Sequence, residues 1–461
     1  MDTVVETARS AVREEGSEPA YQRLASALAR VAMEGTARLP SARALAAASG
    51  LSRATVTEAY RELARRGVLV LRRGRPRRGH LDSSPLLPID ESEPPAGVLD
   101  LARYAPDREL IPPGRLFEWL GLGEGEGEGV EQYGTALGYP PLRSWIAARL
   151  RGQGVDVDSH HVLLTAGAQH ALDLILRTLV AGGDAVLVED PTYPGLLPLL
   201  AMHRVRALSV PVAVTGLDPD DLAAVTRRHE ARLAILTPTL HNPSGTVLDR
   251  ASRLAVLESL TSAGTIPVEE YFDPGLVIDG TVPPPLAALS RRAILVGSFS
   301  KALFPGLRVG WIVAGDDILR RLTAVKTATD LSGSPFLEAT AYGLCRRGLL
   351  DEQLRRLRLA AATRSAVVLD ALAAAPPDVR WSRPRGGFSL QVELPPSVSS
   401  QALAARAAAS GTWVLPGPRI SVTGRDNVTR IAFAAVGGAT LRKGIETFVK
   451  ALSPGGPLPL V

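Results

Sequence analysis

The chain has 461 residues, 46% of them hydrophobic and 21% charged, which is the balance of a folded globular protein and is long enough for two or three domains. The single cysteine, Cys345, excludes an internal disulfide. The first residues carry acids and lack the apolar core of a secretion signal, and no apolar run reaches the length of a membrane span. We therefore expect a cytoplasmic protein without membrane contact, and we assign no residue to a metal.

The basic charge is concentrated at the front of the chain. Residues 1–80 contain 15 arginines and 8 acidic residues, whereas the whole chain has a net charge of only +5. A small basic module ahead of a nearly neutral region indicates a polyanionic partner for the front alone. A solvated basic face would explain the same charge.

The basic module has the pattern of two helices joined by a tight turn. After a first helix expected near residues 21–33, Ser41 can cap a short helix that ends at Gly50. Ser52 can cap the next helix, with Leu51 and Val56 placed as a hydrophobic staple. The apolar stripe of that helix comprises Val56, Ala59, Tyr60 and Leu63. This is a helix-turn-helix pattern.

Residues 68–81 complete the module. The run "VLVL" at 68–71 predicts a strand, "RRGRPRRG" a basic turn and "HL" a possible return strand, which together make a wing.

The module resembles the winged-helix DNA-binding domain of GntR-type bacterial regulators. The residues that carry the resemblance are Leu39, Pro40, Ser41, Arg43, Leu45, Ala46, Ser52, Arg53, Thr55, Val56, Ala59, Tyr60, Leu63 and Gly67. The resemblance implies contacts to double-stranded DNA from Ser41, Arg43, Ser52, Arg53, Thr55, Arg73 and Gly74. The turn before Leu39 is shorter than in the family, and the wing carries extra arginines.

Behind this module, residues 82–100 are rich in proline, serine and acids, which indicates a linker. From about residue 160, apolar runs at 185–190, 233–238, 265–270 and 293–301 alternate with helical patterns at 168–180 and 250–263. This alternation predicts an α/β fold with a mainly parallel sheet covered on both faces. Ligands of such sheets bind beyond the carboxyl ends of the strands. We expect domains at 14–81, 101–340 and 341–452, with the linker between the first two.

Lysine is rare in this chain. Of 52 basic residues only Lys301, Lys326, Lys443 and Lys450 are lysines. Lys301 lies in "GSFSKALFPGLRVGW" directly after a predicted strand, where an amine could form an imine with an aldehyde. The helix start at 165–172 offers N–H groups for a phosphate. The predicted phosphate cradle comprises Gly167, Ala168, Gln169, Ser298, Ser300 and Arg308.

Three further residues follow other predicted strands. Tyr193 in "EDPTYPG" offers a flat partner for a ring, Glu270 ends the strand "TIPVEE" with a carboxylate, and Asn242 in "HNPSG" offers an amide donor. Each fragment alone occurs by chance in many proteins. Their occurrence in one order, each after a strand, fits a site for a phosphorylated pyridine aldehyde.

These residues make the region resemble the fold-type I, pyridoxal-phosphate-dependent aminotransferases of class I/II. The segments "YGTALGYPPLRSWIAARL" and "NVTRIAFA" extend the resemblance to about residues 100–452. It implies a large domain with a smaller C-terminal α+β subdomain, a homodimer, and Arg430 as the residue that holds a ligand carboxylate. An ordinary surface arginine on a late strand is the alternative for Arg430. A winged helix ahead of such a region is the layout of MocR-type transcriptional regulators.

The chain departs from that pattern at "EEYFD", residues 269–273. MocR-type chains usually carry Glu-Asp-Asp-Tyr-Asp there, so an ungapped alignment puts Glu270 in place of the aspartate that pairs with the pyridine nitrogen. Phe272 replaces the tyrosine that donates to the ring oxygen. Tyr271 could replace that donor only if the strand end slipped by one residue.

Three functions remain open on the sequence. The first is a transcriptional regulator that senses an amine, an amino acid or the cofactor itself through an aldimine on Lys301. The second is an aminotransferase with a vestigial front domain. The third is a regulator whose large domain has lost the cofactor and only dimerises.

Overall fold

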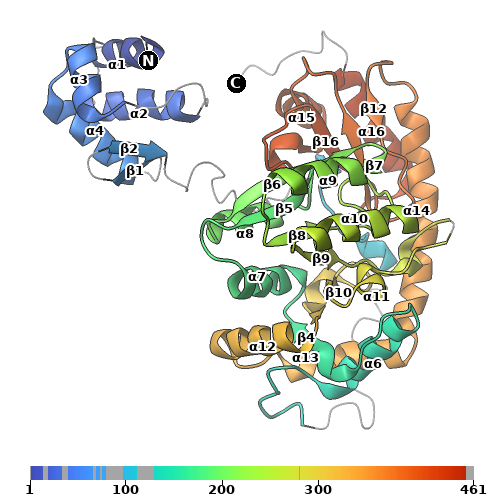
Figure 1. The fold of residues 1–461 in the computed structure, drawn as a ribbon. Helices are drawn as coiled ribbons and strands as arrows, with labels where there is room; N and C mark the ends of the chain where they lie inside the picture. Colours follow the sequence, from blue (N-terminus) through green and yellow to red (C-terminus); the bar gives the residue numbers. More distant parts are fainter. Residues whose placement is uncertain are drawn as a thin grey trace. The chain divides into compact units, whose positions relative to one another are not determined.

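The structure is a computed structural model that describes residues 2–13, 19–33, 40–65, 69–72, 75–78, 97–111, 129–279 and 281–452. It divides into two compact units, Met1–Pro88 and Ile89–Val461 (Figure 1). No helix within the described residues is both long enough and apolar enough to span a bilayer.

The first unit is helical with one hairpin. Its elements are α1 (Asp2–Arg13), α2 (Ala20–Met33), α3 (Ala42–Ser49), α4 (Arg53–Arg65), β1 (Leu69–Arg72) and β2 (Arg75–Arg78). The predicted stripe of α4 is buried against α1, α2 and α3 in one apolar cluster. α1 was not predicted, and the structure adds it to a unit whose start the sequence placed at residue 14. It joins the cluster through Val4 and Ala8, and Arg9 donates to the Ala48 carbonyl at 2.6 Å.

The predicted helix caps are present at both ends of the turn. The Ser41 hydroxyl accepts a hydrogen bond from the Ala44 N–H at 3.2 Å, and Gly50 ends α3 at φ 74°. The Ser52 hydroxyl accepts from the Thr55 N–H at 3.0 Å at the start of α4. These bonds satisfy N–H groups that have no partner inside a helix, so the turn geometry follows from the local sequence.

Removing the first cap should loosen α3. We expect Ser41→Ala to cost about 1 kcal/mol of local stability, or roughly fivefold faster amide exchange in α3. Hydrogen exchange of the full chain, followed by mass spectrometry, measures this effect. Ser41→Asp retains a side-chain acceptor and should exchange like the wild type, and equal acceleration in both variants would contradict a capping role.

One part of the wing prediction was wrong. The return strand is formed by Arg75–Arg78, inside the run predicted as a basic turn, rather than by residues 80–81. β2 pairs antiparallel with β1 from Arg72 opposite Arg75 to Leu69 opposite Arg78. Residues 80–81, and the predicted DNA contacts Arg73 and Gly74, lie outside the described residues.

The second unit is built on an eight-stranded sheet in the order β4-β11-β10-β9-β8-β5-β6-β7. The strands are β4 (Val162–Thr165), β5 (Ala185–Asp190), β6 (Arg206–Ala213), β7 (Gly216–Leu217), β8 (Leu233–Leu236), β9 (Ile266–Glu270), β10 (Ile294–Ser298) and β11 (Gly310–Val313). The neighbours from β10 through β9, β8 and β5 to β6 are parallel, and β11 runs antiparallel to both of its neighbours. The predicted mainly parallel sheet is confirmed.

Helices cover both faces of this sheet. The helices are α6 (Pro140–Arg151), α7 (Ala168–Leu179), α8 (Leu196–Met202), α9 (Pro219–Arg228), α10 (Arg250–Ser262), α11 (Leu286–Leu289), α12 (Asp316–Asp330) and α13 (Pro335–Arg346). One apolar cluster joins the sheet to α7, α8 and α12, and another joins it to α9, α10 and α11 (Figure 1). Both predicted helices, α7 and α10, are present.

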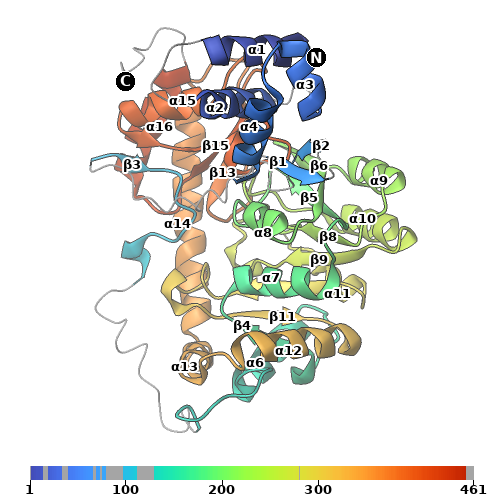
Figure 2. The ribbon, with the colours of Figure 1, turned by 90° about the vertical axis from the view of Figure 1, so that its left-hand side faces the viewer.

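A smaller α+β layer follows. It comprises α14 (Leu349–Leu372), β12 (Arg380–Trp381), β13 (Ser389–Glu393), α15 (Ser400–Ala409), β14 (Thr412–Trp413), β15 (Leu415–Pro416), β16 (Val428–Ala432) and α16 (Gly438–Leu452). Its sheet has the order β12-β13-β16-β15, and β14 pairs instead with β3 (Leu99–Asp100) near the start of the unit. Figure 2 shows α14 running alongside the unit from this layer toward α13.

Candidate functional site

A pocket of about 230 Å³ opens at the carboxyl ends of the parallel strands. The predicted site residues that line it are Ala168, Gln169, Tyr193, Asn242, Glu270, Ser298, Ser300, Lys301 and Arg308. They come from the ends of β5, β9 and β10, from the loops after β8 and β10, and from the start of α7. Gly167 directly precedes α7, and Arg430 lies on β16 behind Asn242. Nine of the predicted residues therefore line one pocket, and Gly167 and Arg430 adjoin it without being among its lining residues.

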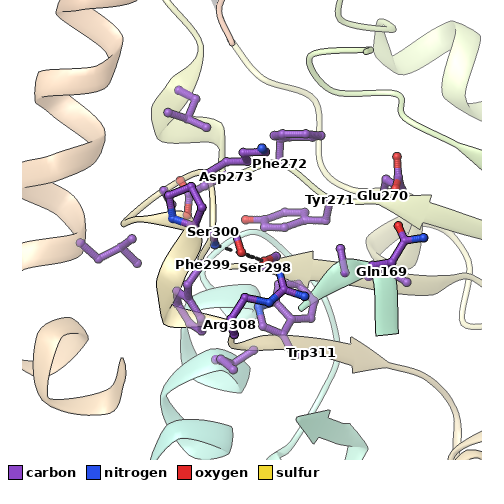
Figure 3. Close-up of a pocket in the computed structure, with 18 of the residues that line it drawn as sticks. Gln169, Glu270, Tyr271, Phe272, Asp273, Ser298, Phe299, Ser300, Arg308 and Trp311 are labelled. Carbon is purple, nitrogen blue, oxygen red and sulfur yellow. Dashed lines mark hydrogen bonds between the residues drawn. The ribbon is translucent and has the colours of Figure 1, made fainter. Parts of the chain in front are cut away.

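One side of the pocket concentrates groups that bind anions. The Ser298 hydroxyl donates to the Ser300 hydroxyl at 3.0 Å and accepts from the Ser300 N–H at 3.1 Å (Figure 3). Arg308 lies beside Gly167 and donates to the Ala166 carbonyl at 2.8 Å. A side chain at Gly167 would meet that guanidinium at 3.2 Å, and its φ of 95° also favours glycine. The N–H groups at the start of α7 face the same corner of the pocket.

The pocket also carries a buried carboxylate, which lies near Gln169 (Figure 3). Glu270 is the last residue of β9, and its Oε2 accepts from the Thr237 hydroxyl at 3.3 Å. Burial raises its pKa to about 7, and the hydrogen bond from Thr237 opposes that shift. Near neutral pH this group can therefore hold a proton or give it up to a partner inside the pocket.

The raised pKa makes stability depend on pH. Folded Glu270 binds a proton more tightly than the unfolded chain does, so its contribution to stability falls as pH rises from about 4.5 to 7. We compare the free energies of unfolding of Glu270→Gln and wild type without bound ligand. The difference in favour of Glu270→Gln should increase by about 2–3 kcal/mol between pH 5 and pH 8. Chemical unfolding at both pH values measures this. Glu258→Gln on the exposed face of α10 is the matched control, and a pH-independent difference for Glu270→Gln would contradict the assignment.

Lys301 and Arg430 both lie against Tyr104. The Lys301 amine donates to the Tyr104 carbonyl and lies 5.0 Å from the centre of its ring. Arg430 donates to the Ala102 carbonyl at 2.7 Å and to the Asn242 Oδ1 at 3.2 Å, and its guanidinium lies 5.2 Å from the same ring centre. Arg430 is 3% exposed, and burial lowers its pKa to about 10. The alternative of a surface arginine on a late strand is therefore wrong.

The strand end at 269–273 keeps its register. Glu269 points away from the pocket and accepts from the Leu286 N–H at 2.6 Å, whereas Glu270 lines the pocket. Tyr271 and Phe272 follow the strand and also line the pocket, so Tyr271 reaches the pocket without the one-residue slip that the sequence made the condition for its role as a donor. The Tyr271 hydroxyl is hydrogen-bonded to the Gln153 side chain at 2.7 Å. Figure 3 shows its ring beside Ser298 and Ser300.

Several aromatic and charged residues of the pocket were not predicted. Trp145 and Arg149 on α6 line it, with the Arg149 guanidinium 5.3 Å from the Trp145 ring. Trp311 on β11 packs on Tyr271 with ring centres 5.3 Å apart. Tyr104 comes from the segment that starts the unit. None of these residues follows a parallel strand directly, so strand-end patterns could not indicate them.

In the first unit, the predicted DNA contacts that the structure describes lie at the starts of α3 and α4. Arg43, Ser52 and Arg53 are exposed, and Ser41 and Thr55 are half-buried. They form the polar surface of the turn opposite the buried stripe of α4. The serines also cap their helices, so these two positions have a structural role besides any contact with DNA.

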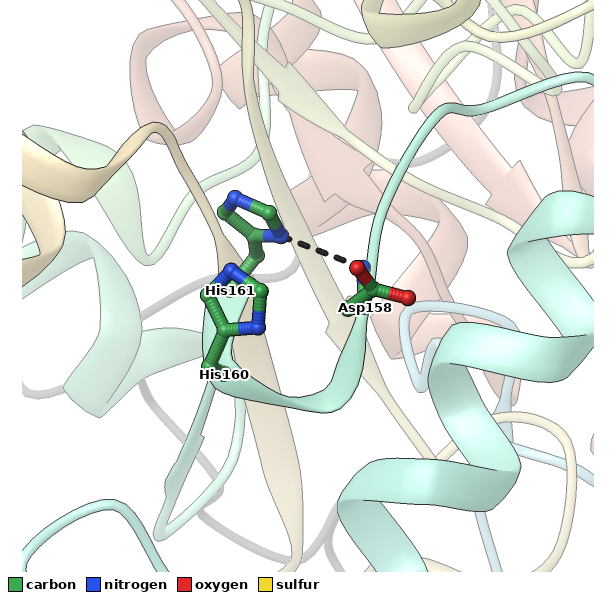
Figure 4. A group of neighbouring side chains, drawn as sticks. All are labelled: Asp158, His160 and His161. Carbon is green, nitrogen blue, oxygen red and sulfur yellow. Dashed lines mark hydrogen bonds between the residues drawn. The ribbon is translucent and has the colours of Figure 1, made fainter.

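A separate cluster of possible metal ligands lies on the 3₁₀ turn η3 (Ser159–His161). Asp158, His160 and His161 bring their ligand atoms within 4.8 Å of one another (Figure 4). The His161 Nδ1 already accepts from the Asp158 N–H at 3.1 Å, and its Nε2 lies 3.5 Å from Asp316. Both nitrogens of His161 thus have partners that hold the turn, and we assign the cluster a capping role.

Residues 100–448 match the family profile described as "Aminotransferase class I and II". The chain belongs to this family. Residues 17–78 match the profile "Bacterial regulatory proteins, gntR family". The chain therefore carries a GntR winged helix ahead of its aminotransferase region, which is the MocR architecture.

The relatives of this chain include aminotransferases and transcriptional regulators. A 2-aminoadipate transaminase of Thermus thermophilus is 32% identical over 79% of this chain and 92% of its own. An uncharacterised HTH-type transcriptional regulator of Escherichia coli, YdcR, is 28% identical over 87% of this chain and 92% of its own. Among solved structures, the α-aminoadipate aminotransferase LysN from Thermus thermophilus, in complex with N-(5'-phosphopyridoxyl)-L-leucine, has a TM-score of 0.72 at 31% identity, over 77% of this chain and 92% of its own.

Proposed function

We propose that the protein is a DNA-binding transcriptional regulator that uses pyridoxal phosphate to sense an amine or amino acid. The observation that carries this proposal is the pocket itself, because a lysine amine, an anion-binding corner and a buried carboxylate line one cavity in a chain that also has a winged helix. A regulator requires a ligand that distinguishes two conformations and does not require turnover.

The residues present fit the cofactor. The phosphate suits the corner formed by Ser298, Ser300, Arg308 and the start of α7. Glu270 suits the pyridine nitrogen, since a positive charge there would stabilise the carboxylate that burial otherwise disfavours. The aldehyde would be attached to the Lys301 amine as an imine, and the bound cofactor supplies an electron sink for chemistry at the carbon next to an amine. The Gln169 Oε1 is buried without a hydrogen-bond partner among the described residues and faces the same space.

Other site residues have proposed roles toward the ring and the effector. Tyr193 offers an aromatic face, and Asn242 offers an amide that Arg430 orients through its hydrogen bond. Arg430 would pair with the carboxylate of an amino-acid effector, because its Nε is buried without a partner among the described residues. The loss of the tyrosine hydroxyl at Phe272 removes one donor and favours sensing over turnover.

The DNA side of the proposal involves a homodimer on an operator. The starts of α3 and α4 would enter the major groove, with Ser41, Arg43, Ser52, Arg53 and Thr55 contacting phosphates and base edges. Arg73 and Gly74 would contact DNA from the wing. Two winged helices in one dimer would read half-sites whose separation follows the dimer geometry.

An active aminotransferase is the second candidate. It is favoured because this chain aligns with 92% of the length of the 2-aminoadipate transaminase. Two assays on the purified full chain separate the candidates. One titrates DNA from upstream of its own gene, and the other follows transfer of the amino group from an amino-acid panel to a 2-oxo acid. The regulator proposal expects salt-sensitive, sequence-specific DNA binding with little turnover. Ordinary turnover without specific DNA binding would overturn it.

A further inference from the structure

The segment from Ala102 to Tyr104 lies against two residues of the proposed ligand site, Lys301 and Arg430. The Tyr104 carbonyl accepts the hydrogen bond of the Lys301 amine, and the Ala102 carbonyl accepts from Arg430. Both cations also lie over the Tyr104 ring, at 5.0 and 5.2 Å from its centre. One short stretch of chain thus holds Arg430, which would receive a ligand carboxylate, and also contacts the lysine that would carry the cofactor.

The segment is anchored on both sides of these contacts. Before it, the Leu101 N–H donates to the Trp413 carbonyl at 2.8 Å and the Leu101 carbonyl accepts from the Ala432 N–H at 2.7 Å. After it, the buried Asp107 pairs with Arg364. Between these anchors, Tyr104 packs edge-on against Phe388 and Phe272 with ring centres 5.4 and 6.5 Å away. The Asp100 side chain also accepts from the Ala102 and Arg103 N–H groups, at 2.9 and 3.0 Å, so an effector that displaces the segment must work against these contacts.

The geometry of an α-amino acid forces competition. Its nitrogen and carboxylate carbon are bonded to the same carbon and lie about 2.5 Å apart. A ligand whose amine joins the cofactor and whose carboxylate pairs with Arg430 would therefore have to enter the space beside Arg430, where the Ala102 carbonyl and the Tyr104 ring now lie. A simple amine without a carboxylate does not need the space beside Arg430.

We propose that residues 102–104 act as an internal ligand that competes with the carboxylate of amino-acid effectors for Arg430. This inference rests on the proposed function, since it concerns the same pocket. The internal ligand raises the concentration at which a carboxylate-bearing effector binds, because only the fraction of molecules with the segment displaced is competent. Tyr104 thereby sets the selectivity of the site between amino acids and simple amines.

The test uses the full-length chain loaded with pyridoxal phosphate and titrated with L-alanine or ethylamine. Binding is followed by the visible spectrum of the bound cofactor. For Tyr104→Ala we expect the half-saturating concentration of L-alanine to fall about tenfold relative to that of ethylamine, because the ring that lies over Arg430 and the packing of the segment are removed. Tyr104→Phe retains the ring and should match the wild type. Tyr104→Leu retains apolar volume without the ring, and it carries the test if the alanine variant does not fold.

A second readout follows the segment itself. In the wild type, L-alanine should speed hydrogen exchange of the backbone amides between residues 101 and 107, and ethylamine should affect them less. The internal ligand would be overturned by two results together. The ratio of the half-saturating concentrations of L-alanine and ethylamine would stay at the wild-type value in both Tyr104→Ala and Tyr104→Leu, and L-alanine would leave hydrogen exchange between residues 101 and 107 unchanged. A wild-type chain that never gains the visible imine band would instead overturn the proposed function, so the two failures can be told apart.

Discussion

Lys301→Ala is expected to abolish the covalent attachment of pyridoxal phosphate. Lys301 is the lysine that lines the pocket, whereas Lys326 is buried in an ion pair with Asp330 and Lys443 is exposed on α16. Without the amine no imine can form, so the visible imine band should be absent. Borohydride should then leave no pyridoxyl group on the peptide that spans residue 301. Absorption spectra and peptide mass mapping measure both effects.

Lys443→Ala is the matched control, because it removes an exposed lysine of the same unit. It should retain the full imine band and the pyridoxyl adduct on Lys301. The phosphate corner is unchanged in Lys301→Ala, so weak non-covalent binding of the cofactor, without an adduct, is expected to remain in that variant. An adduct that appears in Lys301→Ala at another lysine with the same yield would contradict the role of Lys301.

Arg53→Ala is expected to have the largest effect on DNA binding among single substitutions in the first unit. Arg53 is exposed at the first residue of α4, where helix-turn-helix proteins contact DNA. One such arginine contributes about 1–3 kcal/mol, and the substitution acts twice in the proposed dimer, so the affinity should fall at least about 30-fold. The slope of log affinity against log salt should also become less steep by about one for each phosphate that is no longer neutralised. Fluorescence anisotropy with labelled operator DNA measures both quantities.

Arg228→Ala controls for the removal of one positive charge. Arg228 is exposed on α9 in the second unit, so its removal changes the net charge by the same amount without touching the winged helix. Its affinity for DNA should stay within about twofold of wild type. An equal decrease for both variants would mean that net charge, rather than the start of α4, determines binding.

Short sequence patterns predicted the helix caps, the buried stripe of α4 and the strand ends, because interactions within a few residues determine these features. Ser41 and Ser52 cap their helices, and Val56 and its neighbours on the stripe are buried, because capping and amphipathicity act over a few residues. The strands that end at Asp190, Glu270 and Ser298 were recognisable as short apolar runs. Since the carboxyl ends of parallel strands meet at one edge, the residues after them could be placed together in advance.

Long-range packing determines the parts that were missed. The approach of Tyr104 to Lys301 joins residues 197 positions apart, and no spacing rule indicates such a contact. The start of α1 lacked a recognisable cap, and its role is visible only through burial of Val4 and Ala8 against the other helices. The arginine run at 75–78 has the composition of a solvated turn, yet pairing with Leu69–Arg72 makes it a strand. This miss differs from the other two, because the pairing is local along the chain and outweighs composition in such short strands.

The measurement that tests the central claim most directly is the affinity for operator DNA as a function of what occupies the Lys301 pocket. Full-length protein is compared without cofactor, with pyridoxal phosphate, and with pyridoxal phosphate plus each member of an amine and amino-acid panel, at one salt concentration. We predict that Kd for DNA changes at least about fivefold between two of these states in the wild type and stays constant in Lys301→Ala. A wild-type Kd that is the same in every state, while the imine band shows that the pocket is filled, would contradict a regulator that senses through Lys301.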